Sequence, residues 1–225
     1  MGRELIIVAK SENLTNQVYQ TLKDKIINNE VLPNTYLDEK VICESLGVSR
    51  TPVREALARL EQDGLVVFIP RRGVMVSDLS LQTIIELIHI RKVMEPSLLR
   101  PYFRLYDKDV LRDFRDRQEK VLENEDVETF YKLDYEFHKY LYEGTKKRHI
   151  IKLLSYVSDQ HQRIRSQDYY RQRRLTKGAK DHIQIIDALL HDEYDLAYQL
   201  LLTHTSDMEA YYHGLLMSDM AAYGI

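Results

Sequence analysis

Four side chains in the second half of the sequence are of types that bind transition metals. Asp134 and His138 are four residues apart, so on a helix both would point to the same side. The midpoint between His182 and His204 lies at Glu193, where a turn between two antiparallel helices would bring the two imidazoles level. Three imidazoles and one carboxylate suit Zn, Ni, Fe or Mn and leave coordination positions for further oxygen ligands.

The spacing of these residues is also compatible with a chance grouping. The chain has eight histidines, and His191 and His213 are as far apart in the sequence as His182 and His204. A metalloenzyme is a further alternative, because an open coordination position on a metal can activate water or oxygen. Against an enzyme, the sequence has no recognisable Ser/His/Asp arrangement, no phosphate-binding glycine loop and no dinucleotide-binding fingerprint.

A second group of side chains could bind nucleic acid. Ser49 is a suitable cap for a helix over 50–63, and Arg50 and Arg54 would project from one side of its N-terminal end. Arginine can donate two hydrogen bonds to O6 and N7 of guanine, and it also binds phosphate. Ser49, Thr51 and the free N–H groups of the first turn could hold a phosphate. For any single arginine, an ordinary solvated surface charge is the alternative.

The elements that would position these arginines are two short helices after a longer one. Apolar residues recur every four positions within a predicted helix over about 11–29. A second helix is expected over 38–46, where Gly47 can end it, and the helix over 50–63 follows after a short turn. This pattern predicts a helix-turn-helix.

A β-hairpin is predicted directly after the third helix. The segments 65–69 and 74–76 are rich in β-branched residues, and they flank a Pro-Arg-Arg-Gly turn. Arg71, Arg72 and Gly73 would then lie at the hairpin tip, where a wing meets the DNA backbone or the minor groove. The order of elements is that of a winged helix-turn-helix, whose third helix enters the major groove with its N-terminus first.

The remainder of the chain is predicted to be helical, since proline and glycine concentrate before residue 75. The fold class is therefore mostly α, with a winged helix-turn-helix at 1–77 (three helices and a β-hairpin wing) and an all-α bundle at 78–225. The predicted helices of the bundle are 80–105 (kinked at Pro96), 108–124, 126–143, 147–169, 173–190 and 192–217.

Composition places few limits on the function. The chain has 225 residues, 44 % of them hydrophobic, and a net charge of −3, which by itself does not favour a nucleic-acid partner. Its first 77 residues contain ten basic and ten acidic side chains, so a DNA interface must depend on where the basic residues lie. The single cysteine, Cys43, excludes an internal disulfide, and we find no signal peptide and no membrane-spanning run. We expect a cytoplasmic protein.

The predicted winged helix-turn-helix contains a distinctive stretch of sequence. Residues 37–57 are LDEKVICESLGVSRTPVREAL, followed by LEQDGL at 60–65 and RGVMV at 72–76. Together they closely resemble the DNA-binding domain of GntR-family transcription regulators, over about residues 14–76. The resemblance implies DNA contacts by Lys40, Arg50, Thr51, Arg54 and the wing residues Arg71, Arg72 and Gly73. Asn34 and Ile42-Cys43 depart from the family pattern at scaffold positions.

The second half, residues 80–217, resembles the FCD ligand-binding domain of the FadR subfamily. The matching residues are Arg91, Glu95, the DYEFH segment at 134–138, His182 and His204. The resemblance implies that Asp134, His138, His182 and His204 hold a divalent metal, and six helices point to the VanR-like group. In such domains the metal often anchors a small carboxylate. Arg91, and Arg163 or Arg165, are candidate partners of that carboxylate, with a structural salt bridge as the alternative for each.

We therefore predict a ligand-responsive transcription regulator, a repressor, that binds a near-palindromic operator in double-stranded DNA as a homodimer. A small organic acid would bind in a metal-containing helical pocket. Three alternatives are a regulator for which the metal itself is the signal, a fatty acyl-CoA sensor without metal, and the metalloenzyme.

Overall fold

The computed structural model describes residues 2–165 and 171–223, and its side chains over 13–163 and 175–218. The chain divides into two compact units, residues 1–79 and 80–225. In the described part, no helix is both long enough and apolar enough to cross a bilayer.

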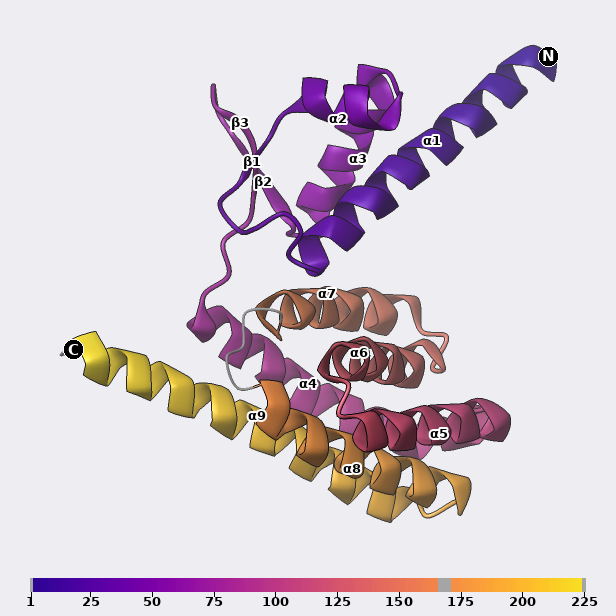
Figure 1. The fold of residues 1–225 in the computed structure, drawn as a ribbon. Helices are drawn as coiled ribbons and strands as arrows, with labels where there is room; N and C mark the ends of the chain where they lie inside the picture. Colours follow the sequence, from indigo (N-terminus) through magenta and orange to yellow (C-terminus); the bar gives the residue numbers. More distant parts are fainter. Residues whose placement is uncertain (1, 166–170, 224–225) are drawn as a thin grey trace. The chain divides into compact units, whose positions relative to one another are not determined.

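The N-terminal unit contains three helices and a small antiparallel sheet (Figure 1). The sheet has the strand order β1-β3-β2. The elements are α1 (Gly2–Ile27), β1 (Tyr36–Leu37), α2 (Glu39–Leu46), α3 (Arg50–Gln62), β2 (Val66–Ile69) and β3 (Gly73–Val76).

The core of this unit forms where α1 crosses α3. The apolar stripe of α1 includes Val18 and Ile26, which pack with Val53, Leu57 and Leu60 of α3, and all five are at most 2 % exposed. Burial of such side chains is the main source of stability in a domain of this size. Of the apolar residues that recur every four positions in α1, Val18, Leu22 and Ile26 are therefore buried, whereas Leu14 is only partly buried.

Local signals set the ends of α2 and the shape of the wing. The Asp38 carboxylate accepts hydrogen bonds from two N–H groups of the first turn of α2, and Gly47 ends that helix in the left-handed conformation (φ 65°). In the hairpin, Ile69 pairs with Gly73, which leaves a three-residue loop between the strands. Arg71 (φ 66°) and Gly73 (φ 101°) adopt positive φ values in this turn.

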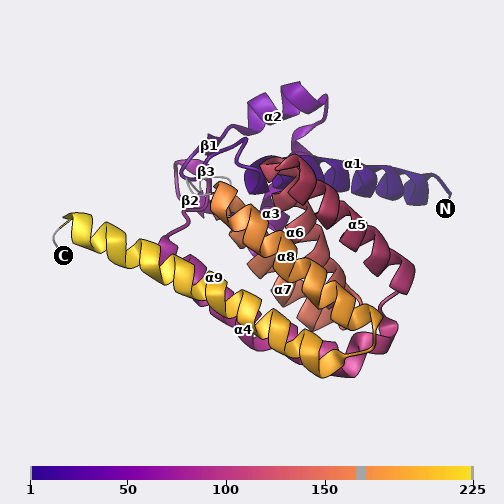
Figure 2. The same ribbon diagram turned by 60° about the horizontal axis from the view of Figure 1, so that its bottom comes forward.

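The C-terminal unit contains six α-helices in its described part. The elements are α4 (Leu81–Tyr102), a 3-10 turn η1 (Phe103–Leu105), α5 (Lys108–Asn124), α6 (Val127–Glu143), α7 (Arg148–Arg165), α8 (Arg171–Leu190) and α9 (Tyr194–Tyr223). Helices α4 and α9 lie side by side, as Figures 1 and 2 both show. Helix α5 packs against α8, and α6 packs against α7 and α8.

An aromatic and aliphatic core holds α5, α6, α8 and α9 together. Phe114, Phe137, Ile185 and Leu201 supply one residue from each of these helices, and none is more than 6 % exposed. The turn between α8 and α9 falls at residues 191–193, as the sequence predicts. Asp126 and Gly144 cap the two ends of α6.

The structure corrects several predicted boundaries. Helix α1 begins at Gly2 and not near residue 11, and α4 ends at Tyr102, three residues short of the predicted end. Helix α4 continues through Pro96 and Pro101. Strand β1 was not predicted, because a two-residue strand has no periodicity of its own and forms only by pairing with β3.

Candidate functional sites: a DNA interface and a metal centre

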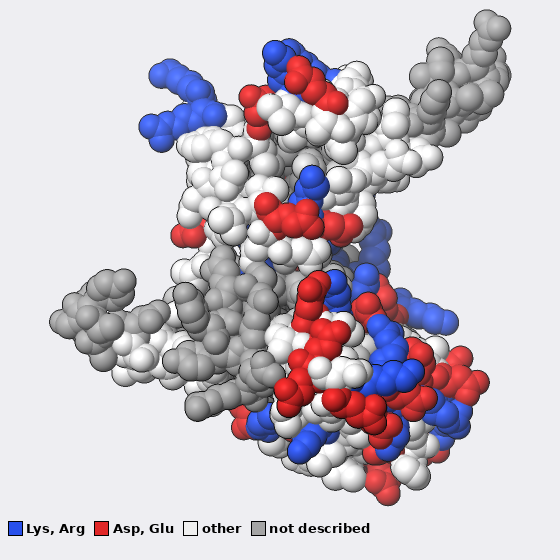
Figure 3. Space-filling view, viewed as in Figure 1, with Lys and Arg blue, Asp and Glu red and all other residues white. Residues whose placement is uncertain are grey.

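The side chains predicted to contact DNA all lie on the surface of the N-terminal unit. They come from the start of α2, the start of α3 and the hairpin loop, and each is exposed: Lys40, Ser49, Arg50, Thr51, Arg54, Arg71, Arg72 and Gly73. Basic side chains project from the tip of the hairpin in Figure 3. None of the predicted contacts is locked inside the fold.

The N-terminus of α3 is suited to an anion. Ser49 occupies the predicted N-cap position with extended backbone, although its hydroxyl makes no capping hydrogen bond. The first turn contains no acidic residue. Unsatisfied N–H groups and the positive end of the helix dipole therefore face solvent beside Arg50 and Thr51, which is the arrangement that binds a DNA phosphate.

Two carboxylates, one in α3 and one at its C-cap, accept hydrogen bonds from α1. Thr15 donates a hydrogen bond to Glu55 (2.7 Å), and Tyr19 donates one to Asp63 (2.5 Å). Both donors belong to α1, so these carboxylates serve to join the two helices. Although the first 77 residues have no net charge, exposed arginines lie at the start of α3 and in the hairpin loop.

One ion pair at this surface was not predicted. Nε of Arg54 donates a hydrogen bond to Oε2 of Glu39, the first residue of α2, over 2.8 Å. Since 15 residues separate the two in sequence, no local pattern indicates the pair.

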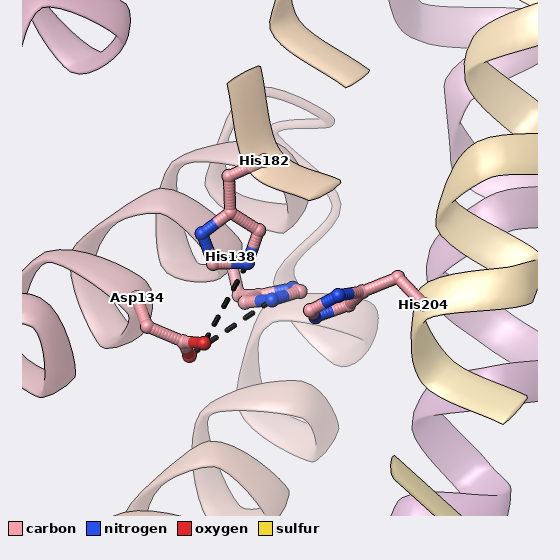
Figure 4. Close-up of side chains that lie close together, drawn as sticks. All are labelled: Asp134, His138, His182 and His204. Atoms are coloured by element: carbon pink, nitrogen blue, oxygen red, sulfur yellow. Dashed lines mark ion pairs between the residues drawn. The ribbon is translucent and has the colours of Figure 1, made fainter. Parts of the chain in front are cut away.

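The four predicted metal ligands come together from three helices (Figure 4). Asp134 and His138 project from α6, His182 from α8 and His204 from α9. One ligand atom from each residue lies within 4.8 Å of those from the other three, and all four side chains are buried. The Asp134 carboxylate is 3.6 Å from Nε2 of His182 and 3.9 Å from Nε2 of His138.

Two of the three histidines are held by a carboxylate at the ring nitrogen that faces away from this centre. Nδ1–H of His138 donates to Glu95 on α4 over 2.8 Å, and Nδ1–H of His204 donates to Asp181 on α8 over 3.1 Å. A carboxylate on Nδ1 fixes the tautomer in which Nε2 carries the lone pair, which is the form that binds a metal.

An amide holds the third histidine. The side-chain amide of Gln118 on α5 lies 3.0 Å from Nδ1 of His182. The Oε1 atom of this buried amide accepts no hydrogen bond within the described part of the chain. Because the two ends of an amide are assigned from their hydrogen bonds, turning Gln118 over lets Oε1 accept from Nδ1–H. His182 then has the same tautomer as the other two histidines.

The buried Nε2 atoms indicate what this centre needs. Nε2 of His138 and Nε2 of His204 make no hydrogen bond to any described residue, although both are buried. Burial, together with the nearby Arg91 cation, lowers the pKa of His138 well below its ordinary value of 6.5, so this imidazole is neutral. Buried polar atoms without partners are costly. A divalent metal bound through the lone pairs of these Nε2 atoms would give each of them a partner. The residues present therefore fit such an ion.

The arginines predicted to meet an effector have partners of their own. Arg91 is fully buried and donates to both carboxylate oxygens of Glu95, over 2.8 and 3.4 Å, and its NH1 atom lies 2.7 Å from Nδ1 of His161. Arg163 is also buried and donates to Gln160. The side chain of Arg165 lies outside the described residues.

Sequence reasoning missed the role of three residues that orient the ligands. Glu95 matches the family pattern, but its contact with His138 did not follow from that match. Neither Gln118 nor Asp181 was predicted. Asp181 directly precedes His182 in the sequence, but it holds His204 on the neighbouring helix, since consecutive helical residues point in different directions. A polar residue at a helix position that should be buried was the available signal for Gln118.

Comparison with known proteins agrees with both halves of this description. Residues 14–76 match the family described as bacterial regulatory proteins, gntR family, and residues 86–207 match the FCD domain. The HTH-type transcriptional regulator YdhC of Bacillus subtilis is 29 % identical over 193 residues, which cover 84 % of this chain and 86 % of that protein. The Nta operon transcriptional regulator of Aminobacter aminovorans is 30 % identical over 175 residues, covering 76 % and 81 %.

Solved structures show the same fold. A GntR transcriptional regulator from Rhodococcus sp. RHA1 has a TM-score of 0.77 at 29 % identity, covering 89 % of this chain and 97 % of that one. The Zn2+-bound FCD domain of TM0439 has a TM-score of 0.54 at 21 % identity, covering 63 % and 99 %. The relatives are named as regulators, which sets the metalloenzyme alternative aside. The chain belongs to the GntR family of bacterial regulatory proteins with an FCD domain, and it is a DNA-binding transcription regulator.

Proposed function

We propose that this regulator is a repressor that senses a small organic acid through a metal held by Asp134, His138, His182 and His204. Arg50 and Arg54 of each subunit of a homodimer enter successive major grooves of a near-palindromic operator, and the wing arginines contact the backbone or minor groove. Repression is supported by a relative, the transcriptional repressor RspR of Escherichia coli, which is 28 % identical over 134 residues.

The observation that carries the metal proposal is the convergence of the four ligand atoms. They lie within 4.8 Å of one another in a buried centre, while two outer carboxylates and one amide hold the three imidazoles from behind. Ligand histidines in metalloproteins have such outer partners as a rule. The FCD domain of TM0439, which binds Zn2+, supports the proposal that this fold holds a metal here.

The charge of the centre favours an anionic effector. Asp134 supplies one negative charge, the charges of Glu95 and Asp181 are matched by Arg91 and Lys177, and the neutral His138 adds none. A divalent cation would therefore leave one uncompensated positive charge in a buried place, which is unfavourable unless an anion accompanies it. A small carboxylate would supply that charge and oxygen ligands together.

In this mechanism, Asp134, His138, His182 and His204 would hold the metal, which would supply coordination positions for the oxygens of the acid. Glu95, Gln118 and Asp181 keep the imidazoles in place, so the ligand set is formed before the metal enters. The acid changes operator affinity only if it binds one arrangement of the dimer more tightly than the other.

Operator binding tests this proposal directly. The full chain first selects a duplex from a library with a randomised centre, and its affinity for that duplex is measured in the metal-stripped and the metal-reloaded state, with a panel of small carboxylates. We expect an acid to alter the affinity of the reloaded protein alone, and His182→Ala to abolish that response. If metal alone produced the full change, the metal would be the signal. If neither metal nor any acid had an effect, the sensing proposal would be wrong.

A further inference from the structure

The ion pair between Glu39 and Arg54 joins two helices at the surface proposed to read DNA. Oε2 of Glu39 accepts a hydrogen bond from Nε of Arg54 over 2.8 Å. The Glu39 side chain is 29 % exposed, and that of Arg54 is 62 % exposed. The Glu39 side chain is therefore more buried than that of Arg54, most of which faces solvent.

The neighbouring residues leave Glu39 available for this contact. Asp38 caps α2, because its carboxylate accepts hydrogen bonds from the N–H groups of Lys40 (2.7 Å) and Val41 (3.3 Å). Glu44 pairs loosely with Lys40 over 3.8 Å along the same helix. Of the acidic residues of this helix and its cap, Glu39 is thus the one that contacts α3.

The pairing determines which atoms of Arg54 remain available. A guanidinium has five N–H donors, and the Nε donor is taken by Glu39. Within the described part of the chain, the two terminal nitrogens of Arg54 make no hydrogen bond. These are the atoms that can pair with O6 and N7 of guanine. Arg50 forms no ion pair with any described residue, so it has no such restraint.

We propose that Glu39 is a specificity-determining residue, which holds the guanidinium of Arg54 so that its terminal nitrogens meet a guanine edge. The proposal rests on the proposed contact between Arg54 and DNA. Two physical effects support it. The ion pair restricts the rotamers of a long side chain before binding, so less freedom is given up in the complex. The carboxylate also repels phosphate, which favours contact with a base over contact with the backbone.

A purely structural tie between α2 and α3 is the alternative. Exposed ion pairs contribute little to stability, so removal of this one should barely change thermal unfolding. The decisive readout is the dependence of binding on a single guanine atom, which a structural role would not alter.

The experiment uses the full chain and the duplex that it selects from a randomised library. Each guanine of the half-site is replaced in turn by 7-deazaguanine, which lacks the N7 acceptor. Binding is measured for the wild type, Glu39→Ala, Glu39→Gln and Arg54→Ala. Glu44→Ala is the matched control, because it removes the same charge from the same helix without touching Arg54.

We expect one guanine at which the N7 replacement weakens wild-type binding by roughly tenfold, the scale of one good base contact. Glu39→Ala should reduce that penalty to about twofold or less while keeping binding to unselected DNA, and Glu39→Gln should give an intermediate penalty. Glu44→Ala should keep the full penalty.

Two results would overturn the proposal in distinguishable ways. If Glu39→Ala kept the full N7 penalty while Arg54→Ala abolished it, Arg54 would read the guanine without help from Glu39. If Arg54→Ala bound the duplex as the wild type does and kept every N7 penalty, the DNA contact of Arg54 would itself be wrong, and the role of Glu39 would be wrong with it.

Discussion

Asp181→Asn should weaken metal binding although Asp181 is not expected to touch the metal. Its carboxylate accepts a hydrogen bond from Nδ1–H of His204 and forms an ion pair with Lys177 over 3.0 Å. Burial raises the pKa of Asp181, but these two partners outweigh burial and lower it, so the carboxylate is charged at neutral pH. An asparagine of the same shape removes the charge that holds His204 in its metal-binding tautomer.

The size of the effect follows from the role of such outer partners. Removal of a partner behind a ligating histidine costs about 10- to 100-fold in metal affinity, or about 1.4–2.8 kcal/mol. A metal that binds only the folded state stabilises it in proportion to the logarithm of its affinity. The metal-dependent rise in Tm should therefore shrink by roughly 3–10 °C.

The assay is competition for Zn2+ between the metal-stripped protein and a chromophoric chelator, with thermal unfolding in parallel. Asp207→Asn is the matched control. Asp207 also forms an ion pair with Lys177, over 2.8 Å, but its side chain is 48 % exposed. It should bind Zn2+ as the wild type does. Equal affinities for Asp181→Asn and the wild type, or an equal loss in Asp207→Asn, would refute the reasoning.

Three further results are expected. Arg50→Ala should weaken binding to the selected duplex by roughly 10- to 100-fold in fluorescence anisotropy, and unchanged binding, or an equal loss in the exposed control Arg112→Ala, would contradict the recognition-helix assignment. Alanine at both Arg71 and Arg72 should lower the slope of log K against log salt by about 0.9 for each phosphate that the wing no longer neutralises, and an unchanged slope would remove the wing from the interface. Ion pairs with basic residues of α4 outweigh the effect of burial and lower the pKa of Glu209 below its ordinary value of 4.5. The contribution of Glu209 to stability is therefore present at neutral pH and disappears in acid. The wild type should have a higher Tm than Glu209→Gln at neutral pH, and the two Tm values should converge below the pKa of Glu209. A Tm difference that does not change with pH would contradict this prediction.

Sequence patterns were most informative where local chemistry determines structure. Helix α3 follows from Ser49 and its apolar stripe, and the wing from a Pro-Arg-Arg-Gly turn between β-rich segments. The pairing of His182 with His204 could be predicted because one turn between two long helices fixes their register.

The remaining features depend on contacts between distant segments. Glu95, Gln118 and Asp181 each orient a histidine on another helix, so only the packing of α4, α5, α8 and α9 reveals them. The contact of Glu39 with Arg54 likewise depends on the crossing of α2 and α3. Arg91 could be placed at the site from the sequence, but its pairing with Glu95 could not be distinguished from binding an effector.

The metal content of the purified full-length protein tests the metal centre most directly. Elemental analysis should find about one transition-metal ion per chain in the wild type. His182→Ala should lose it, while His191→Ala, which alters a histidine at the nearby turn, outside the four-residue cluster, should keep it. A wild type that holds no transition metal after growth in metal-supplemented medium, or a His182→Ala variant that holds as much as the wild type, would contradict the proposed site.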